Sequence, residues 1–414
     1  MSHTIGLKCL LCGAEYALHE VEYVCPLHGD EGILDVQYDY ASISRTLPLE
    51  DLVGSRDYSM WRYKPLLPVE PESPVPPLSV GWTPLYPADR LAESLNLKHL
   101  WIKDDGRQPT ASLKDRASAI AVVRAREAGS QIVATASTGN AAAALAGLCA
   151  SVGQPNVIFV PASIPEAKIA QLLVFGSTVL LVEGTYDDAF ELCLEATRTY
   201  GWYNRNTGYN PYMTEGKKTA VLEICEQLDW RAPDCIFVSV GDGCIIGGLH
   251  KGLKDLLALG WIDHMPRLIG VQAAGSAALY NAWKRGVDPS EITPVEVRTI
   301  ADSIAAGLPR DRIKAMRAVR ESGGAFVAVT DDEILQAMQT LAGGCGVFAE
   351  PAGAASFAGL LKAVPSGLVE SGEQIVVLIT GSGLKDVRAV LKLPGKGKTV
   401  RIEPRLEAVA AALQ

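Results

Sequence analysis

Short runs of apolar and β-branched residues alternate with longer segments of helical spacing over most of the chain after residue 98. The apolar runs are bounded by glycine or polar residues, which is typical of strands buried on both faces. They predict strands at 99–105, 131–137, 156–161, 178–184, 201–206, 235–241, 267–273, 326–330 and 374–381. The intervening segments predict helices at 112–128, 139–152, 165–175, 186–200, 215–228, 245–258 and 331–343. This alternation indicates an α/β protein with doubly wound sheets.

The first 80 residues carry a weaker pattern. From residue 29 to about 80 the chain is expected to be irregular, apart from a strand-like run at 32–40. Seven prolines lie between residues 65 and 84, as in an ordered arm or linker, because proline disrupts both helices and central strands. At the other end, the alanine-rich segment 405–414 predicts a last helix.

The composition is that of an ordinary globular chain. Its 414 residues are 48% hydrophobic and 21% charged, with a formal net charge of −9. No dense Lys/Arg run occurs, so nucleic acid and anionic membranes are poor candidate partners. No apolar window of about 20 residues and no N-terminal targeting pattern occur either, so we expect a cytoplasmic protein. Six of the nine cysteines are scattered among apolar or small residues, as buried reduced thiols are.

The other three cysteines cluster near the N-terminus. Cys9, Cys12, Cys25 and His28 follow the spacing C-x2-C-x12-C-x2-H. Two knuckles joined by a hairpin over 16–24 could bring four donors to one tetrahedral ion, and zinc is the usual occupant. The protein would fill all four positions, which predicts a structural role. A ribbon that folds without metal is the alternative.

Polar, glycine-rich segments follow three of the predicted strands, at 136–142, 240–248 and 380–386. Ligands of doubly wound sheets bind where the strands end at their carboxyl edge. In the second segment the glycines precede a helix, so backbone N–H groups and the helix N-terminus could hold a phosphate. The spacing matches neither the dinucleotide fingerprint nor the P-loop, which favours a small cofactor with a single phosphate.

Lys114 stands at the start of a predicted helix, where the helix dipole disfavours a positive charge. The small residues Thr110, Ala111 and Ser112 precede it and leave room for a ligand. A lysine kept partly neutral by burial can form an imine with an aldehyde. Together with a single phosphate site, this pattern predicts pyridoxal 5′-phosphate as the cofactor. For this stretch alone, a surface lysine that opens an amphipathic helix is the alternative.

Seven motifs together resemble the fold-type II pyridoxal-phosphate enzymes, and within them the threonine synthases. They are "MWRYKPLLP", "GWTPLYPADRLAESLNLKHLWIKDDGRQPTASLKDRA", "ASTGNAAAALAG", "NPYMTEGKKTAVLEICEQL", "GDGCIIGGLHKG", "FAEPAGAASFAG" and "TGSGLKD". The resemblance implies two doubly wound domains behind a zinc-ribbon-like module. The expected division is the module at 1–40, a large cofactor-binding domain at 41–118 and 215–414, and a small α/β domain at 119–214. A lyase that acts on an amino-acid substrate as a homodimer is also implied.

The resemblance further implies roles for individual residues. Lys114 would be the Schiff-base lysine and the catalytic base. Asn140 would hydrogen-bond the cofactor's 3′-oxygen, Glu350 would lie close to the ring, and Thr380 would face the pyridine nitrogen. A hydroxyl cannot keep that nitrogen protonated, which suits elimination and replacement better than transamination. The phosphate loop would be Gly241, Asp242, Gly243, Cys244 and Ile245. The substrate-binding residues would be Thr110, Ser112, Ser137, Thr138 and Gly139.

Three features depart from the threonine synthases. Met213 stands where an arginine usually helps to hold the substrate's phosphate, and a thioether cannot replace a cationic fork. Asp242 and Cys244 replace an asparagine and a glycine, so the Asp242 side chain must turn away from the anion or stay protonated. The segments 298–309 and 350–355 are closer to threonine and serine ammonia-lyases. Cations that could hold a substrate phosphate are Arg116, Lys168, Lys217, Lys218 and Arg310.

Several functions remain open at this point. In one, Lys114 removes the Cα proton of O-phosphohomoserine and shuttles a Cβ proton, phosphate leaves from Cγ, and water then adds at Cβ to give threonine. In another, threonine or serine loses its β-substituent and yields ammonia and a 2-oxo acid. A β-replacement on O-phosphoserine, as in cysteate synthases, is a third. A non-catalytic amino-acid-binding module is disfavoured, because a binder needs no imine-forming lysine.

Overall fold

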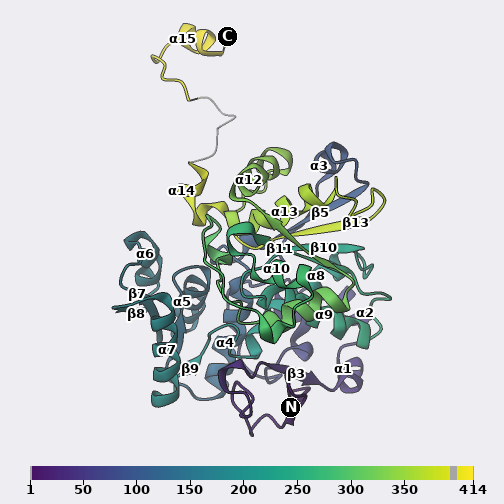
Figure 1. Cartoon of the computed structure of the whole chain (residues 1–414), viewed down its shortest axis with the longest axis vertical. Helices are drawn as coiled ribbons and strands as arrows, with labels where there is room; N and C mark the ends of the chain where they lie inside the picture. The colour runs from purple at the N-terminus through teal and green to yellow at the C-terminus, as the bar shows by residue number, and fades with distance from the viewer. Residues whose placement is uncertain (1, 392–398, 414) are drawn as a thin grey trace.

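Two largely parallel sheets and one small antiparallel sheet organise the chain (Figure 1). The computed structural model describes residues 2–391 and 399–413. The largest sheet has six strands in the order β12-β11-β10-β13-β5-β4, and only the edge strand β4 is antiparallel to its neighbour. These strands are β4 (Leu85–Pro87), β5 (His99–Asp104), β10 (Cys235–Ser239), β11 (Arg267–Ala273), β12 (Ala325–Val329) and β13 (Gln374–Ile379).

The other two sheets come from separate parts of the chain. The second sheet is wholly parallel, in the order β8-β7-β6-β9. Its strands are β6 (Val133–Ala136), β7 (Asn156–Pro161), β8 (Thr178–Val182) and β9 (Tyr203–Asn204). The third sheet lies at the N-terminus in the order β2-β1-β3 and is antiparallel. Its strands are β1 (Thr4–Cys9), β2 (Glu15–Tyr16) and β3 (Leu34–Tyr38).

The α-helices connect the strands, and most of them pack around the two larger sheets (Figure 1). Those of the first half are α1 (Tyr40–Thr46), α2 (Leu49–Val53), α3 (Asp89–Ser94), α4 (Lys114–Glu127), α5 (Asn140–Val152), α6 (Glu166–Val174) and α7 (Tyr186–Tyr200). Those of the second half are α8 (Tyr212–Gln227), α9 (Cys244–Ala258), α10 (Ala278–Arg285), α11 (Arg312–Glu321), α12 (Asp331–Cys345), α13 (Pro351–Ala363), α14 (Val387–Val390) and α15 (Leu406–Leu413). In Figure 1, α5, α6 and α7 surround the second sheet.

Strand β13 shows that both faces of the six-stranded sheet are covered. Ile375 and Val377 belong to the apolar core formed with α12 and α13, whereas Val376 and Leu378 belong to the core formed with α8 and α9. All four side chains are fully buried. Successive side chains of a strand point to opposite faces, so a continuous apolar run needs cover on both. The prediction of a doubly wound α/β fold is confirmed.

Every predicted strand and helix is present, with ends that shift by a few residues, and α15 covers the described part of the last predicted helix. Two expectations for the N-terminal region are wrong. Residues 17–23 form turns and bends, so no hairpin joins the two knuckles, and β1 pairs with β2 and β3 instead. The region 29–80 is not wholly irregular, because it holds α1, α2 and a 3-10 helix at Met60–Leu66.

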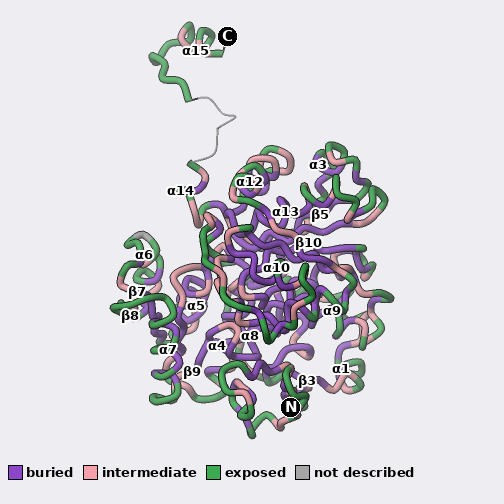
Figure 2. Tube along the Cα trace, in the orientation of Figure 1, coloured by how far each residue is buried: buried purple, intermediate pink, exposed green. Residues whose placement is uncertain are grey.

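The most deeply buried residues lie in the central strands of the six-stranded sheet (Figure 2). The centre of the molecule, around β10, β11 and β13, is buried, whereas α15 stands apart at the top of the view and has no buried residue. Among the described helices, none has both the length and the hydropathy needed to span a membrane.

Candidate active site and metal cluster

A cavity of about 860 Å³ lies at the carboxyl ends of strands from both larger sheets. Its walls include Lys114, the segment 137–140 that follows β6, and the segment 241–245 that follows β10. The structure therefore brings together at one cavity a lysine and two strand-end segments that the sequence singled out. It does not place Thr110, Ser112, Glu350 or Thr380 among the residues that line this cavity.

Backbone hydrogen bonds to the end of β13 hold Lys114 in place. The N–H of Leu113 donates to the carbonyl of Thr380 (2.9 Å), and the N–H of Ser382 donates to the carbonyl of Ala111 (3.0 Å). Ala111 has a φ of +64°, which side-chain-bearing residues rarely adopt. Lys114 is then the first residue of α4. Burial lowers the pKa of its amine below the ordinary value, and the nearby guanidinium of Arg205 lowers it further.

The segment after β6 forms the N-terminus of α5. Ser137, Thr138 and Gly139 precede Asn140, so the unpaired N–H groups of the first helical turn and the positive end of the helix dipole lie at the cavity wall. The Ser137 N–H already donates to the Phe159 carbonyl (3.3 Å), and the Gly139 N–H donates to the Ser137 hydroxyl (3.3 Å). The Asn140 amide donates to Glu350 Oε1 (2.8 Å) and Oε2 (3.1 Å). A carboxylate or another anion fits the N–H groups of such a helix start.

Glu350 lies behind Asn140, in a second cavity of about 460 Å³ that shares Thr138, Gly139 and Asn140 with the first. Only 4% of its surface is exposed, and burial raises the pKa of its carboxyl above the ordinary value. A Cβ at Gly381 would lie 2.4 Å from Glu350 Oε1, so the carboxylate is closely packed against the backbone after β13. This arrangement orients the Asn140 amide.

The segment after β10 is a tight glycine turn into α9. Gly243 has a φ of +94°, and a Cβ there would lie 2.8 Å from Asp311 O and from Ala315 Cβ. A Cβ at Gly241 would lie 2.8 Å from Ile304 Cα. Close packing on one side leaves the N–H groups at the start of α9 free to face an anion on the other. Ser239, at the end of β10, also lines the cavity, and its buried Oγ has no hydrogen-bond partner in the described structure.

Burial favours the protonated forms of Asp242 and Cys244, the two residues of this turn that depart from the threonine synthases. Oδ1 of Asp242 accepts a hydrogen bond from the N–H of Arg310 (3.3 Å), and burial raises the pKa of its carboxyl. Burial also raises the pKa of the Cys244 thiol well above its ordinary value, and Asp311 adds to the effect. The thiol therefore stays protonated, and Ile245 follows it on the cavity wall. The expectation that Asp242 turns away or stays protonated is consistent with this geometry.

Three buried residues expected at the site, Thr110, Ser112 and Thr380, are not among the residues that line this cavity. The Thr110 N–H donates to Asp115 (2.7 Å), and its hydroxyl donates to the same carboxylate. Ser112 is buried, and its Oγ has no partner in the described structure. Thr380 is buried at the end of β13.

The cations expected to hold a substrate phosphate fall into three groups. Arg116 pairs with Asp105 (2.7 Å) and Glu223, and Lys218 pairs with Glu215 and Asp255 (2.6 Å each), so these two are committed to buried networks. Lys168 forms a surface pair with Asp302 (2.6 Å). Arg310 lines the cavity with its guanidinium 3.6 Å from the centre of the Phe190 ring. Lys217 does not line the cavity but is fully buried, with its Nζ 3.3 Å from Oγ1 of the lining residue Thr207.

Arg205 is a cavity residue that the sequence reasoning missed. It directly follows β9 and lines the cavity with 1% of its surface exposed. The sequence did offer a signal, because Arg205 lies at the end of a predicted strand and ligands of doubly wound sheets bind where strands end. The segments after β6 and β10 were identified in the same way. Met213, in contrast, packs into the apolar core and does not line the cavity.

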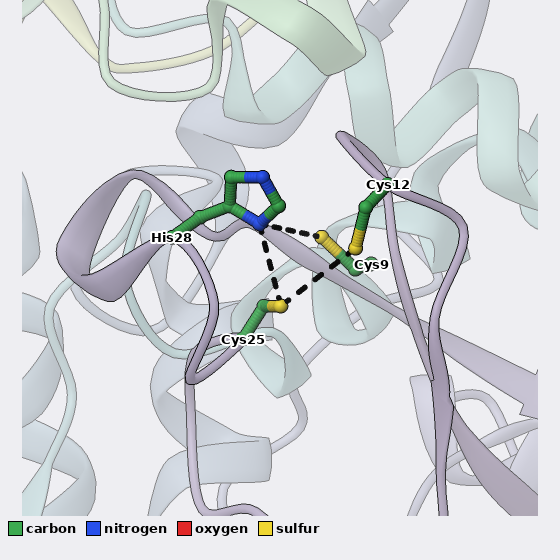
Figure 3. Close-up of side chains that lie close together, drawn as sticks. All are labelled: Cys9, Cys12, Cys25 and His28. Atoms are coloured by element: carbon green, nitrogen blue, oxygen red, sulfur yellow. Dashed lines mark hydrogen bonds between the residues drawn. The ribbon is translucent and has the colours of Figure 1, made fainter.

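The N-terminal donors converge on one point (Figure 3). The three Sγ atoms and a ring nitrogen of Cys9, Cys12, Cys25 and His28 all lie within 4.8 Å of one another. Cys12 Sγ is 4.0 Å from Cys25 Sγ, and His28 Nδ1 is 3.5 Å from Cys25 Sγ. A tetrahedral zinc ion with Zn–S bonds of about 2.3 Å needs sulfur atoms about 3.8 Å apart. The donor set and its spacing therefore fit a tetrahedral metal.

The amino-acid sequence is similar to known enzymes that use pyridoxal phosphate, the cofactor expected at this cavity. Residues 77–381 match the family described as pyridoxal-phosphate dependent enzyme. The chain is 43% identical over 387 residues to the threonine synthase of Methanosarcina acetivorans (93% of each chain), and 38% identical to that of Methanocaldococcus jannaschii (93% of this chain, 94% of the relative). Among solved structures, threonine deaminase isoform 2 of Solanum lycopersicum matches with a TM-score of 0.64 at 24% identity, covering 87% of this chain and 90% of the other. A likeness at that identity concerns the fold alone.

Proposed function

The chain belongs to the pyridoxal-phosphate dependent enzymes, and from that premise we propose that it is a threonine synthase, a lyase that converts O-phosphohomoserine and water into threonine and phosphate. One observation carries the proposal: Lys114 and two helix N-termini meet at a single cavity in a chain that matches named threonine synthases over nearly its whole length. A threonine or serine ammonia-lyase is supported by likeness of fold only.

The residues present fit pyridoxal 5′-phosphate. The start of α9 offers free N–H groups on a glycine turn, and the unpartnered Oγ of Ser239 faces the same cavity. We assign the cofactor's phosphate to Gly241, Asp242, Gly243, Cys244 and Ile245. Lys114 supplies an amine whose lowered pKa favours the neutral, nucleophilic form. When bound, the cofactor stabilises negative charge on the substrate's Cα.

The chain's own groups bind the substrate and move its protons. We assign the substrate's carboxylate to Ser137, Thr138 and Gly139 at the start of α5, where the free N–H groups of the first helical turn favour an anion. The Lys114 amine takes the Cα proton and then a Cβ proton, which allows phosphate to leave from Cγ. It delivers one proton to Cγ and, after water has added its hydroxyl at Cβ, returns one proton to Cα. We assign Asn140 to the cofactor's 3′-oxygen, with Glu350 orienting its amide. The remaining assignments are contacts to the ring or the substrate by Thr110, Ser112 and Thr380.

The metal cluster is proposed to hold a structural zinc ion. Its four donors are all protein groups, so no coordination position is left for substrate. Tyr16 hydrogen-bonds Cys25 Sγ (3.0 Å) and is a further contact to the ligand shell.

We also propose that the protein is a cytoplasmic homodimer. The proposed small domain, 119–214, contains the second sheet, and the proposed large domain, 41–118 and 215–414, contains the first.

A product assay tests the function. Purified enzyme loaded with the cofactor is supplied in turn with O-phosphohomoserine, threonine and serine, and phosphate, threonine and 2-oxo acid are measured. We expect phosphate and threonine in equal amounts from the first substrate. A 2-oxo acid from threonine or serine, with no threonine formed from O-phosphohomoserine, would show an ammonia-lyase and overturn the proposal.

A further inference from the structure

Arg205 is a buried cation whose hydrogen-bonding capacity is not used up. Its Nε donates to Ser118 Oγ (3.1 Å) and its Nη1 donates to Thr207 Oγ1 (3.0 Å). Its Nη2 is buried and has no hydrogen-bond partner in the described structure. Both Arg205 and Thr207 line the large cavity. A guanidinium fixed by two neutral hydroxyls therefore keeps one edge available to a ligand.

Lys217 approaches the same hydroxyl from α8. Its Nζ donates to Thr207 Oγ1 (3.3 Å), and its side chain is fully buried. Within residues 2–391 and 399–413, neither Lys217 nor Arg205 forms an ion pair with a carboxylate. The contrast with other buried cations is plain, because Arg116 and Lys218 each pair with two carboxylates.

Two uncompensated positive charges in one buried place are costly, because burial favours neutral forms and like charges repel. Burial lowers the pKa of Lys217 to about 8, with Lys114 and Arg205 contributing, and lowers the pKa of Arg205 to about 10. A bound dianion would remove this penalty. A planar guanidinium beside an ammonium is also a donor set that suits a phosphate.

A separate site at the start of α9 already serves the cofactor's phosphate in the proposed function. The substrate of that function carries a second phosphate, and Met213, at the position of the usual arginine, lies in the core away from the cavity. We propose that Arg205 and Lys217, positioned by Thr207, bind the phosphate of the amino-acid substrate and so select a phosphorylated substrate. This inference rests on the proposed function and deepens it.

Variants at these positions test the inference. For Arg205→Gln we expect kcat/KM for O-phosphohomoserine to fall about 10- to 100-fold, as expected for lost charge-assisted hydrogen bonds. The inhibition constant of inorganic phosphate should rise by a similar factor, while the dissociation constant of pyridoxal phosphate from the apoenzyme stays within about threefold. Arg205→Lys should recover part of the loss. Arg198→Gln is the matched control, because Arg198 carries the same charge on α7 and pairs at the surface with Asp30.

A second variant, Thr207→Val, distinguishes loss of the phosphate site from loss of the fold. Thr207→Val keeps both cations but removes the hydroxyl that positions them, so weaker phosphate inhibition with an unchanged melting temperature would support the site. If wild-type enzyme makes no threonine but phosphate binding still depends on Arg205, the proposed function fails and the anion site stands. If wild-type enzyme makes threonine and Arg205→Gln changes neither KM nor phosphate inhibition, the inference is overturned. Loss of cofactor affinity alone would also overturn it, because the pair would then serve the cofactor's phosphate.

Discussion

The backbone N–H of Leu113 donates a 2.9 Å hydrogen bond to the carbonyl of Thr380, which joins the residue before Lys114 to the end of β13. Because β13 is a central strand of the six-stranded sheet, the position of the Lys114 amine is tied to the most buried part of the fold. The segments after β6 and β10 reach the same cavity from two different sheets. The site therefore depends on how the two sheets and α4 are held together.

A buried ion network next to α4 should contribute to stability. Burial alone would raise the pKa of Glu223, but Arg116 and Lys103 outweigh it and lower the pKa to about 2. A depressed carboxyl pKa stabilises the fold above the unfolded value of about 4.3, and this contribution is lost as the pH falls toward 2. We expect Glu223→Gln to lower the free energy of unfolding by about 3–5 kcal/mol at pH 7, because it leaves buried cations unpaired.

Urea unfolding followed by circular dichroism measures this difference. Glu15→Gln is the control, because Glu15 forms an exposed pair with Lys8 (2.9 Å) and should change stability by less than about 1 kcal/mol. The difference between wild type and Glu223→Gln should shrink when the pH is lowered from about 5 to about 3. A difference independent of pH would contradict the assigned role.

Close packing of α8 on α4 should be sensitive to one methyl group. A Cβ at Gly216 would lie 2.2 Å from the carbonyl oxygen of Arg116. We expect Gly216→Ala to cost about 1–3 kcal/mol and to weaken cofactor binding, because it displaces the helix that begins at Lys114. Gly343→Ala is the control in the last turn of α12, where no atom lies within 4 Å of the added Cβ, and should stabilise by up to about 0.5–1 kcal/mol. Thermal unfolding and cofactor titration of both variants decide the point.

The N-terminal cluster should hold about one zinc ion per chain. Elemental analysis of purified protein measures the content, and we expect Cys25→Ser to lose the metal and lower the melting temperature. Cys345→Ser, outside the cluster, should keep it. Full metal loading of Cys25→Ser, or metal-free wild-type protein with an unchanged melting temperature, would count against the zinc site.

Phosphate binding should weaken in alkaline solution. The pKa of Lys217 is lowered to about 8 in the free protein, and a bound dianion raises it, so binding above pH 8 requires uptake of a proton. Affinity for glycerol 3-phosphate, whose own second pKa is about 6, should fall by up to about tenfold per pH unit above pH 8. Lys217→Met should bind more weakly and show no such slope. Calorimetric titration between pH 7 and pH 10 checks this, and equal slopes in both proteins would refute it.

The sequence predicted the parallel strands and their helices because continuous apolar runs and helical spacing are local signals. It did not predict α3, α10, α11, α13 or α14. For α13 the reason is that the helix is buried on nearly all sides, so its apolar residues show no period. The predicted hairpin between the two metal-binding segments is absent, because β1 pairs with β3, which lies about 25 residues further along the chain. No local pattern in the sequence reveals such a pairing. For the same reason, only the structure could distinguish Arg116, neutralised by distant Glu223, from Arg205, which lacks a carboxylate partner in the described residues.

We expect the Lys114 amine to be the group that binds the cofactor covalently. Borohydride reduction of the holoenzyme, followed by proteolysis and mass spectrometry, fixes the cofactor to the amine that carries it. We expect a single labelled peptide containing Lys114, and no label in Lys114→Ala. Lys217 and Lys385, whose pKa values burial also lowers, are internal competitors in the same digest. Label on either of them, or on no lysine at all, would contradict the account.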